Sequence, residues 1–296
     1  MTRPPDWRAD AALVVATFFW GVTFAVVKQA LDDSSTFVFL AFRFTLAAAL
    51  VGALFARRWK PDPRARMSAR CGLLAGLCLF VGYGFQTVGL RFTTPTKSAF
   101  VTGLTVVVVP FLAAAVYRSV PALPEAMGAI LAAAGLALMT LPPGAWVPGY
   151  GDLITSGCTV AYAAHVLVIG RFAGRAQFER VAVWQLSACA LLAWLSFPFL
   201  ETPFWHPSSQ WWAAVGITAV FATALGFTIQ AWAQQHTTPL RTALIFSSEP
   251  LFAWAASYAL TGETLSGRGI GGAILILAGI LLVELKPTRR FGHPSY

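Results

Sequence analysis

Two charged residues inside long apolar stretches carry the clearest chemistry in this sequence. Glu249 lies about eleven residues into the apolar run 239–260, roughly 15 Å from its start at the rise of an α-helix. A carboxylate at that depth in a lipid bilayer costs at least a few kcal/mol, so we expect it to face the protein interior and to be paired or protonated. Glu249 is then either a substrate or coupling residue, or half of a structural contact between helices.

Arg43 lies about a third of the way into the run 35–56, too deep for its guanidinium to reach the membrane surface freely. We predict that it pairs with Glu249 or lines a cavity, where a guanidinium could hold the carboxylate of a substrate. A structural bond to backbone carbonyls is the alternative.

Aromatic and amide side chains in the same apolar runs complete the candidate cavity. A mostly apolar pocket with a few placed polar groups suits a small amphipathic ligand. His165 could sense protons or could serve as a hydrogen-bond partner between helices. Trp232 and Gln234 are further cavity candidates, and the predicted substrate-binding residues are Trp20, Phe24, Arg43, Tyr83, Gln86, Thr102, Tyr162, His165, Phe227, Gln230 and Glu249.

Two prolines and two cations lie at matching places in the two halves of the chain. Pro110 and Pro250 interrupt corresponding apolar runs, and such interruptions point to a transporter site or hinge, although proline is also tolerated in membrane helices. Lys97 and Arg241 each follow a Thr-Thr-Pro triplet by two residues. A cation near the positive end of a helix is unfavourable, so we expect either gating contacts or lipid phosphate to offset it.

The composition indicates that these residues are held by membrane-spanning helices. Of 296 residues, 57% are hydrophobic and 11% are charged, whereas soluble chains carry about 25% charged residues. The chain therefore has too few charges to coat a soluble globule. Apolar runs long enough to cross a bilayer as helices fall near 9–31, 35–56, 69–91, 95–118, 121–140, 152–173, 180–200, 209–235, 239–260 and 267–285. The first run lacks a small-residue cleavage site, so we interpret it as a helix rather than a signal peptide.

The basic residues predict the orientation of the chain. With the N-terminus inside, sixteen basic residues face the cytoplasm, and only Lys28, Arg91, Lys97 and Arg268 face outward. The net charge of +9 is spread over short gaps between apolar runs, which argues against nucleic acid as a partner. The four cysteines lie inside apolar runs without a CxxC pair, which is typical of packing residues and not of metal ligands.

An internal repeat predicts the architecture. Thr93-Thr94-Pro95 recurs as Thr237-Thr238-Pro239, and Gly128-Ala129-Ile130-Leu131 recurs as Gly272-Ala273-Ile274-Leu275, both at an offset of 144 residues. Each half then holds five helices, and an odd number forces the halves to cross the membrane in opposite senses. We predict an all-α integral membrane protein of ten transmembrane helices, built as two inverted five-helix repeats around a central cavity. Its parts are a first repeat at 1–140, a linker at 141–151, a second repeat at 152–285 and a cytoplasmic tail at 286–296.

The sequence also resembles the EamA family of the drug/metabolite transporter superfamily, over essentially the whole chain. The resemblance rests on Phe19-Trp20-Gly21-Val22-Thr23-Phe24 with Lys28, on Phe42-Arg43-Phe44, on Gly89-Leu90-Arg91-Phe92-Thr93 with Ser98-Ala99-Phe100, on Arg241-Thr242-Ala243-Leu244-Ile245 through Ser248-Glu249-Pro250, and on Gly262-Glu263-Thr264-Leu265-Ser266. It implies a cavity between the halves and the export of small metabolites or drugs. For substrate, the chain is most similar to the family's amino-acid exporters of the YddG type.

These observations together predict a transporter and not an enzyme. We expect a multi-pass protein of the bacterial cell inner membrane, with both termini cytoplasmic, that exports amino acids (aromatic ones among them) or drug-like compounds by alternating access. The expected partners are a small-molecule substrate and the lipid bilayer, with no cofactor, no metal and no nucleic acid; the oligomeric state is left open, as is the choice between proton-driven and passive transport. A membrane-embedded enzyme acting on lipid or isoprenoid substrates is the alternative, but its acid–base residues would cluster near one interface, and the four histidines here are scattered.

Overall fold

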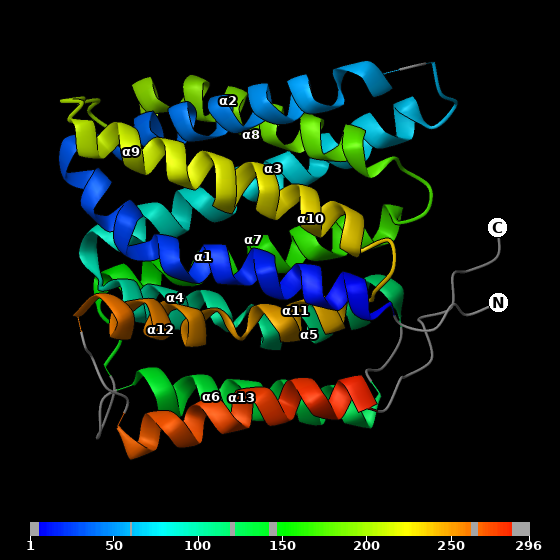
Figure 1. Cartoon of the computed structure of the whole chain (residues 1–296), viewed down its shortest axis with the longest axis vertical. Coiled ribbons are helices and arrows are strands. Elements are labelled where there is room, and N and C mark those ends of the chain that lie inside the picture. The colour runs from blue at the N-terminus through cyan, green and yellow to red at the C-terminus, as the bar shows by residue number, and fades with distance from the viewer. Residues whose placement is uncertain (1–5, 60, 119–121, 142–146, 262–265, 286–296) are drawn as a thin grey trace.

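The computed structural model describes residues 6–59, 61–118, 122–141, 147–261 and 266–285. Within these residues all regular structure is helical, apart from a single backbone bridge between Ser34 and Trp205. The helices run side by side in one bundle (Figure 1). The predicted tail 286–296, the central part of the linker at 142–146 and the motif residues 262–265 lie outside the described residues.

The first half contains α1 (Trp7–Asp33), α2 (Thr36–Phe55), the short η1 (Ala56–Arg58), α3 (Ala65–Phe92), α4 (Pro95–Gly103), α5 (Thr105–Tyr117) and α6 (Leu123–Thr140). The second half contains α7 (Tyr150–Phe172), α8 (Phe178–Leu200), α9 (Ser209–Ile217), the π-helix η2 (Thr218–Leu225), α10 (Gly226–Ala233), α11 (Pro239–Phe246), α12 (Glu249–Thr261) and α13 (Gly267–Leu285).

Seven segments among the described residues are long and apolar enough to cross a membrane. They are Trp7–Asp33, Thr36–Arg58, Ala65–Phe92, Pro95–Tyr117, Tyr150–Phe172, Phe178–Leu200 and Ser209–Ala233. Shorter apolar helices cover Leu123–Met139 and Gly267–Val283. The chain is therefore a multi-pass helical membrane protein, as its composition predicted.

Three of the predicted runs are not continuous α-helices. The run 95–118 breaks at Leu104 between α4 and α5, and the run 239–260 breaks at Ser247 and Ser248 between α11 and α12. The backbone angles at the two breaks are nearly the same, with φ −62° and ψ −8° at Leu104 and φ −64° and ψ −11° at Ser247. The run 209–235 changes to a π-helix between α9 and α10.

Hydroxyl groups add a second hydrogen bond to backbone carbonyls beside these breaks. Thr105 donates to the Thr102 carbonyl at 2.7 Å, and Ser247 and Ser248 donate to carbonyls three residues earlier, both at 2.6 Å. A carbonyl inside a membrane must find a donor within the protein, because no water is available there. Local hydroxyls therefore make a broken helix tolerable at mid-depth.

The predicted hinge prolines lie at different distances from the two breaks. Pro250 is the second residue of α12, and its missing N–H removes a bond to the Phe246 carbonyl, which is the last residue before the break. Pro110 lies inside α5, six residues beyond Leu104. Pro250 therefore accounts for the break at Ser247 and Ser248. The break at Leu104 is not caused by Pro110, which lies six residues further along the chain.

The two Thr-Thr-Pro triplets begin helices at opposite ends of the bundle. We call the end at which α1 begins and α13 ends the proximal end, and the other the distal end (Figure 1). The helix α4 begins at the distal end with Thr94 accepting from the Lys97 amide, and α11 begins at the proximal end with Thr238 accepting from the Arg241 amide. Equivalent helices of the two halves thus run in opposite directions.

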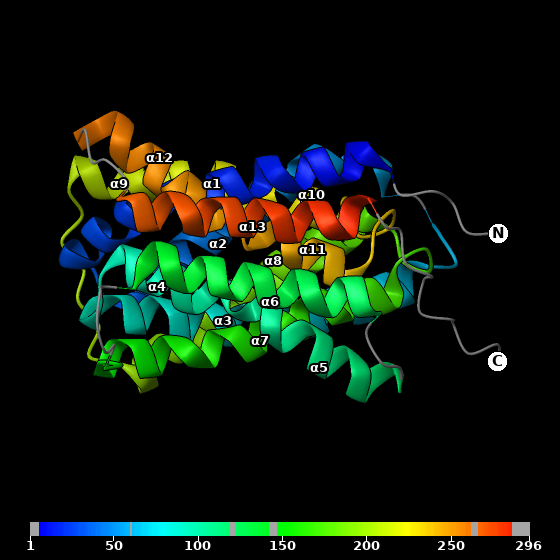
Figure 2. The same cartoon turned by 90° about the horizontal axis from the view of Figure 1, so that it is seen from below.

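Glycines pack the last helix of each half against the other, and α6 and α13 lie side by side in both views (Figures 1 and 2). A Cβ on Gly135 would lie 2.5 Å from the Gly272 carbonyl oxygen, and a Cβ on Gly272 would lie 2.5 Å from that of Gly135. Gly128 and Gly279 approach in the same way, at 2.9 and 2.7 Å. The two contacts are related by the 144-residue offset of the repeat, as an inverted pair of halves requires.

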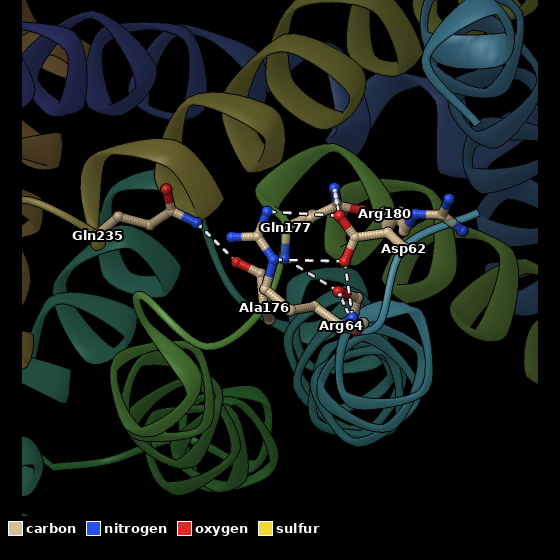
Figure 3. A network of polar contacts seen from close by, with 7 residues as sticks. Asp62, Arg64, Ala176, Gln177, Arg180 and Gln235 are labelled. Carbon is tan, nitrogen blue, oxygen red and sulfur yellow. Dashed lines mark hydrogen bonds and ion pairs between the residues drawn. The ribbon is translucent and has the colours of Figure 1, made fainter. Parts of the chain in front are cut away.

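A polar network joins the two halves at the proximal end (Figure 3). Asp62, just before α3, accepts from the Arg64 amide at 2.6 Å and from the Gln177 side chain at 2.8 Å. Gln177 in turn accepts from Arg180 at 2.6 Å, while Gln235 at the end of α10 donates to the Ala176 carbonyl at 3.0 Å. This end of the bundle is tied together across three loops.

Candidate functional site

A partly open cavity lies in the middle of the bundle between the two halves. Helices α1 to α5 of the first half and α7, α10, α11 and α12 of the second contribute to its wall. Its lining contains all eleven of the residues predicted to bind substrate: Trp20, Phe24, Arg43, Tyr83, Gln86, Thr102, Tyr162, His165, Phe227, Gln230 and Glu249. The structure therefore brings these residues together on one surface, while their role as substrate ligands stays a prediction.

Aromatic rings form most of the wall. The Trp20 ring lies 5.3 Å from Phe227 and 4.8 Å from Phe246, between ring centroids, and its indole donates to the Ala222 carbonyl at 2.6 Å. Tyr83 contacts Tyr162 edge to face at 5.6 Å. These rings hold one another in fixed orientations and present flat apolar surfaces to a ligand.

A chain of two hydrogen bonds joins the two halves at the cavity surface. The Tyr162 hydroxyl donates to Gln86 Oε1 at 3.1 Å, and Gln86 Nε2 donates to the Thr102 hydroxyl at 2.9 Å. Three residues from α3, α4 and α7 are therefore fixed relative to one another at the cavity surface.

Arg43 enters the cavity from α2 and is only 3% exposed. Its Nε donates to the Thr223 hydroxyl at 2.7 Å and its Nη2 donates to the Tyr83 hydroxyl at 3.3 Å, while the Tyr83 ring centroid lies 4.8 Å from its Cζ. The predicted ion pair with Glu249 is wrong, because no ion pair joins these two described residues. In the part of the chain that the structure describes, neutral hydroxyl groups hold the guanidinium and no carboxylate forms an ion pair with it.

Thr223 belongs to the π-helix η2, which the sequence did not reveal. The Thr223 hydroxyl donates to the Thr218 carbonyl five residues earlier at 2.8 Å and accepts from Arg43. A π-helical turn shifts its side chains relative to an α-helix and is frequent at functional sites. Here it places an acceptor against the guanidinium.

Glu249 is the first residue of α12 and is 6% exposed. Among the described residues, none donates a hydrogen bond to its carboxylate and none forms an ion pair with it. The start of α12 carries the positive end of the helix dipole, which favours a carboxylate there. Gly21 of α1 allows this close packing, since a Cβ on Gly21 would lie 2.5 Å from the Glu249 carbonyl oxygen.

His165 is held in a buried network of amides. Its Nε2 lies 2.9 Å from Gln185 Oε1, its Nδ1 lies 3.3 Å from Gln230 Nε2, and Gln230 also donates to Gln234 at 3.0 Å. With an acceptor at Nε2 and a donor at Nδ1, the ring is the neutral tautomer with its proton on Nε2. The network matches the alternative of a hydrogen-bond partner between helices. Gln230 Oε1 is buried with no partner among the described residues.

The four remaining predicted residues do not line the cavity. Pro110 and Pro250 lie in helices that form its wall, Lys97 lies near the start of α4, and Arg241 forms an ion pair with Asp10 at 2.9 Å. Trp232 and Gln234 are also absent from the lining. The lining residues that sequence reasoning missed are Thr23, Val27, Thr87, Leu90, Gly103, Thr105, Val166, Ala243 and Phe246. Helical spacing could have found several, because Thr23 and Val27 follow Trp20 at three and seven residues.

Two cationic side chains at the distal end, Lys28 and Arg91, donate hydrogen bonds to backbone carbonyls. Lys28 Nζ donates to the carbonyls of Leu90 and Arg91 at 2.6 and 2.9 Å, and also to that of Thr93. Arg91 donates to the carbonyls of Leu31 and Ser34. Each side chain thus caps carbonyls at a helix C-terminus, where a positive charge is favourable.

A membrane-embedded helical bundle with a repeated half and a cavity at the repeat interface is the architecture of a secondary transporter. A model of the EamA-like transporter family matches the chain twice, at residues 7–141 and 149–285. The chain belongs to the EamA-like transporter family, and the family domain is present twice.

Relatives and a solved structure agree with this assignment. An uncharacterized transporter of Archaeoglobus fulgidus is 32% identical over 278 residues, covering 94% of this chain and 86% of that protein. The uncharacterized transporter YyaM of Bacillus subtilis is 24% identical over 280 residues, covering 90% of each. A protein crystal structure that is 20% identical matches with a TM-score of 0.78 over 94% of this chain and 98% of that one, which shows the same fold.

Proposed function

We propose that this protein exports small zwitterionic or amphipathic metabolites, amino acids in particular, by alternating access to the central cavity. The observation that carries the proposal is the Glu249 carboxylate, which is buried at the cavity without a partner among the described residues. A buried carboxylate without a partner is costly, so a bound ammonium group or a proton would stabilise it.

Arg43 lines the same cavity, and its surroundings support the proposal of a zwitterionic substrate. Among the described residues, the hydroxyls of Thr223 and Tyr83 accept its hydrogen bonds and no carboxylate does, and the side chain lines the cavity. A ligand with both an ammonium and a carboxylate would satisfy Glu249 and Arg43 together. The aromatic wall around Trp20 and Phe227 would accept an apolar side chain.

The proposed architecture is ten membrane crossings, in which α4 with α5, α9 with η2 and α10, and α11 with α12 each make one crossing. The halves are the first repeat, 1–140, and the second repeat, 152–285, joined by the linker 141–151. The prolines Pro110 and Pro250 would soften the helices that follow the breaks. The positive-inside bias of the basic residues favours a cytoplasmic proximal end, in a bacterial inner membrane, with the tail 286–296 on the same side.

Counterflow in proteoliposomes tests the proposal. Vesicles loaded with unlabelled amino acids or with cationic drugs would be diluted into the radiolabelled compound, and the label would be recovered and identified. We expect transient accumulation of at least one amino acid in unchanged chemical form, and loss of that accumulation in Glu249→Gln. Recovery of a chemically altered label would favour an enzyme, and no accumulation of any compound would overturn the proposal.

Glu179→Gln is the matched control for this experiment. Glu179 is the second residue of α8, lies outside the cavity and forms a partly exposed ion pair with Arg58 at 3.3 Å. The same chemical change at this surface position should leave counterflow unchanged, because exposed ion pairs contribute little to stability.

A further inference from the structure

The ion pair between Asp10 and Arg241 joins the two halves at the proximal side of the cavity. Arg241 Nη2 lies 2.9 Å from Asp10 Oδ2, and the side chains are only 9% and 12% exposed. Asp10 lies in the first turn of α1 and Arg241 is the third residue of α11. Ala243, two residues beyond Arg241, already lines the cavity. The pair therefore holds α1 against α11 where the cavity ends.

The inverted repeat places the same residue types at the distal end. Asp152 lies in the first turn of α7, as Asp10 does in α1, and Lys97 is the third residue of α4, as Arg241 is of α11. Thr93 donates to Asp152 Oδ1, and its counterpart 144 residues later is Thr237. The acid, the threonine and the base thus recur between α4 and α7.

The two ends differ in how the acidic side chain is bound. Asp10 and Arg241 form an ion pair, whereas Asp152 and Lys97, which are both among the described residues, do not. Asp152 is instead bound by Thr93 and by the Gly149 amide, the latter at 3.0 Å. The structure is therefore symmetric in its residues and asymmetric in its ion pairs.

We propose that Asp10–Arg241 and Asp152–Lys97 are alternating latches, and that the second pair forms when the first one opens. In an inverted repeat each half takes, in the opposite state, the conformation that its counterpart has in this one. A contact made only between α1 and α11 then becomes a contact between α7 and α4. The inference rests on the proposed alternating access, and it adds Asp10 and Asp152 as positioning residues of the cycle.

Cysteine accessibility tests the latches without any substrate. In a background with Cys71, Cys78, Cys158 and Cys189 replaced by serine or alanine, Ala243→Cys reports the proximal side of the cavity and Thr87→Cys the distal side. A membrane-impermeant maleimide would be applied from either side of oriented vesicles. We expect Asp10→Asn to increase proximal labelling of Ala243→Cys by about fivefold or more, the lower limit of a typical coupling between two states.

Lys97→Gln should shift the labelling in the opposite direction. It should increase distal labelling of Thr87→Cys and decrease proximal labelling of Ala243→Cys, and Lys97→Arg should keep the original pattern. Lys97 is preferred to Asp152 for this variant, because Asp152 also holds the Gly149 amide. Arg268→Gln, which removes an exposed cation near the start of α13, is the control and should change neither signal.

Two results would overturn the latch proposal. Unchanged labelling in Lys97→Gln would mean that Lys97 serves only the membrane surface, through lipid phosphate for example. A shift in the same direction in Asp10→Asn and Lys97→Gln would mean that the two pairs do not alternate. Counterflow by the parent protein is measured in parallel, so a failed latch in a protein that still transports is distinguished from a failure of the transport proposal itself.

Discussion

Arg43 and Thr223 are joined by a 2.7 Å hydrogen bond from the guanidinium Nε to the threonine hydroxyl. The bond connects α2 of the first half to the π-helix of the second, 180 residues further along the chain. It fixes a buried positive charge at the cavity surface without neutralising it. In the proposed function, this charge is what the carboxylate of a substrate would bind.

Removing this bond should destabilise the protein. Thr223→Val leaves a buried charged donor without its acceptor, which costs about 1–3 kcal/mol, and we expect the melting temperature in detergent to fall by several degrees. Thr223→Ser, which keeps the hydroxyl, should lose less.

Thr228→Val is the matched control for Thr223→Val. Its hydroxyl lies in α10 and is buried with no partner among the described residues. Replacing an unsatisfied hydroxyl by a methyl group should leave the melting temperature unchanged or raise it. Equal losses in the two valine variants would show that the bond to Arg43 contributes nothing specific.

The contact between α6 and α13 should be sensitive to one methyl group. Gly272→Ala places a Cβ 2.5 Å from the Gly135 carbonyl oxygen, so the helices must separate, at a cost of about 1–3 kcal/mol. The neighbouring Gly271→Ala meets nothing within 4 Å and should be neutral. Thermal unfolding of the two variants checks this, and similar melting temperatures would contradict the close packing of these helices.

The proximal network should respond to acid through Asp62. The hydrogen bond from the Arg64 amide holds the pKa of Asp62 below its ordinary value of 3.8. Because the folded-state pKa is lowered, this carboxylate favours folding above its unfolded-state pKa, and the contribution is lost as the pH falls through the folded-state value.

Melting curves of the wild type and of Asp62→Asn between about pH 3 and pH 7 test this linkage. The difference between the two melting temperatures should be constant near neutral pH and should shrink below about pH 4. A difference that does not change with pH would show that the Asp62 charge plays no part in the network of Figure 3.

Several features of the site could be predicted from the sequence because lipid imposes them. A charge such as Arg43 or Glu249 must face the protein interior, and both line the cavity. The Thr-Thr-Pro triplets mark equivalent helix starts, and Thr94 and Thr238 cap helices at opposite ends. Burial of a charged side chain and capping of a helix depend on short segments, so both can be predicted from the residue types in that segment.

Other features depend on contacts between segments that are far apart in the sequence, and these contacts could not be predicted from residue types and spacing. Arg43 was expected to pair with Glu249 or to line the cavity; it lines the cavity, and the π-helical turn brings Thr223 to it in place of Glu249. The break at Leu104 has no proline beside it, and Pro110, from which a hinge was predicted, lies six residues beyond the break. These outcomes depend on helix register, which periodicity does not determine.

We propose that Glu249 and Arg43 together recognise a zwitterion. The most direct measurement is the binding of an amino acid that shows counterflow, of its decarboxylated amine and of its deaminated acid; for phenylalanine these are phenethylamine and 3-phenylpropionate. Glu249→Gln should weaken the amino acid and the amine by about 10- to 100-fold and leave the acid unaffected, whereas Arg43→Lys should weaken the amino acid and the acid and leave the amine unaffected. Equal weakening of all three compounds in either variant would show that Glu249 and Arg43 do not recognise the ammonium and the carboxylate separately.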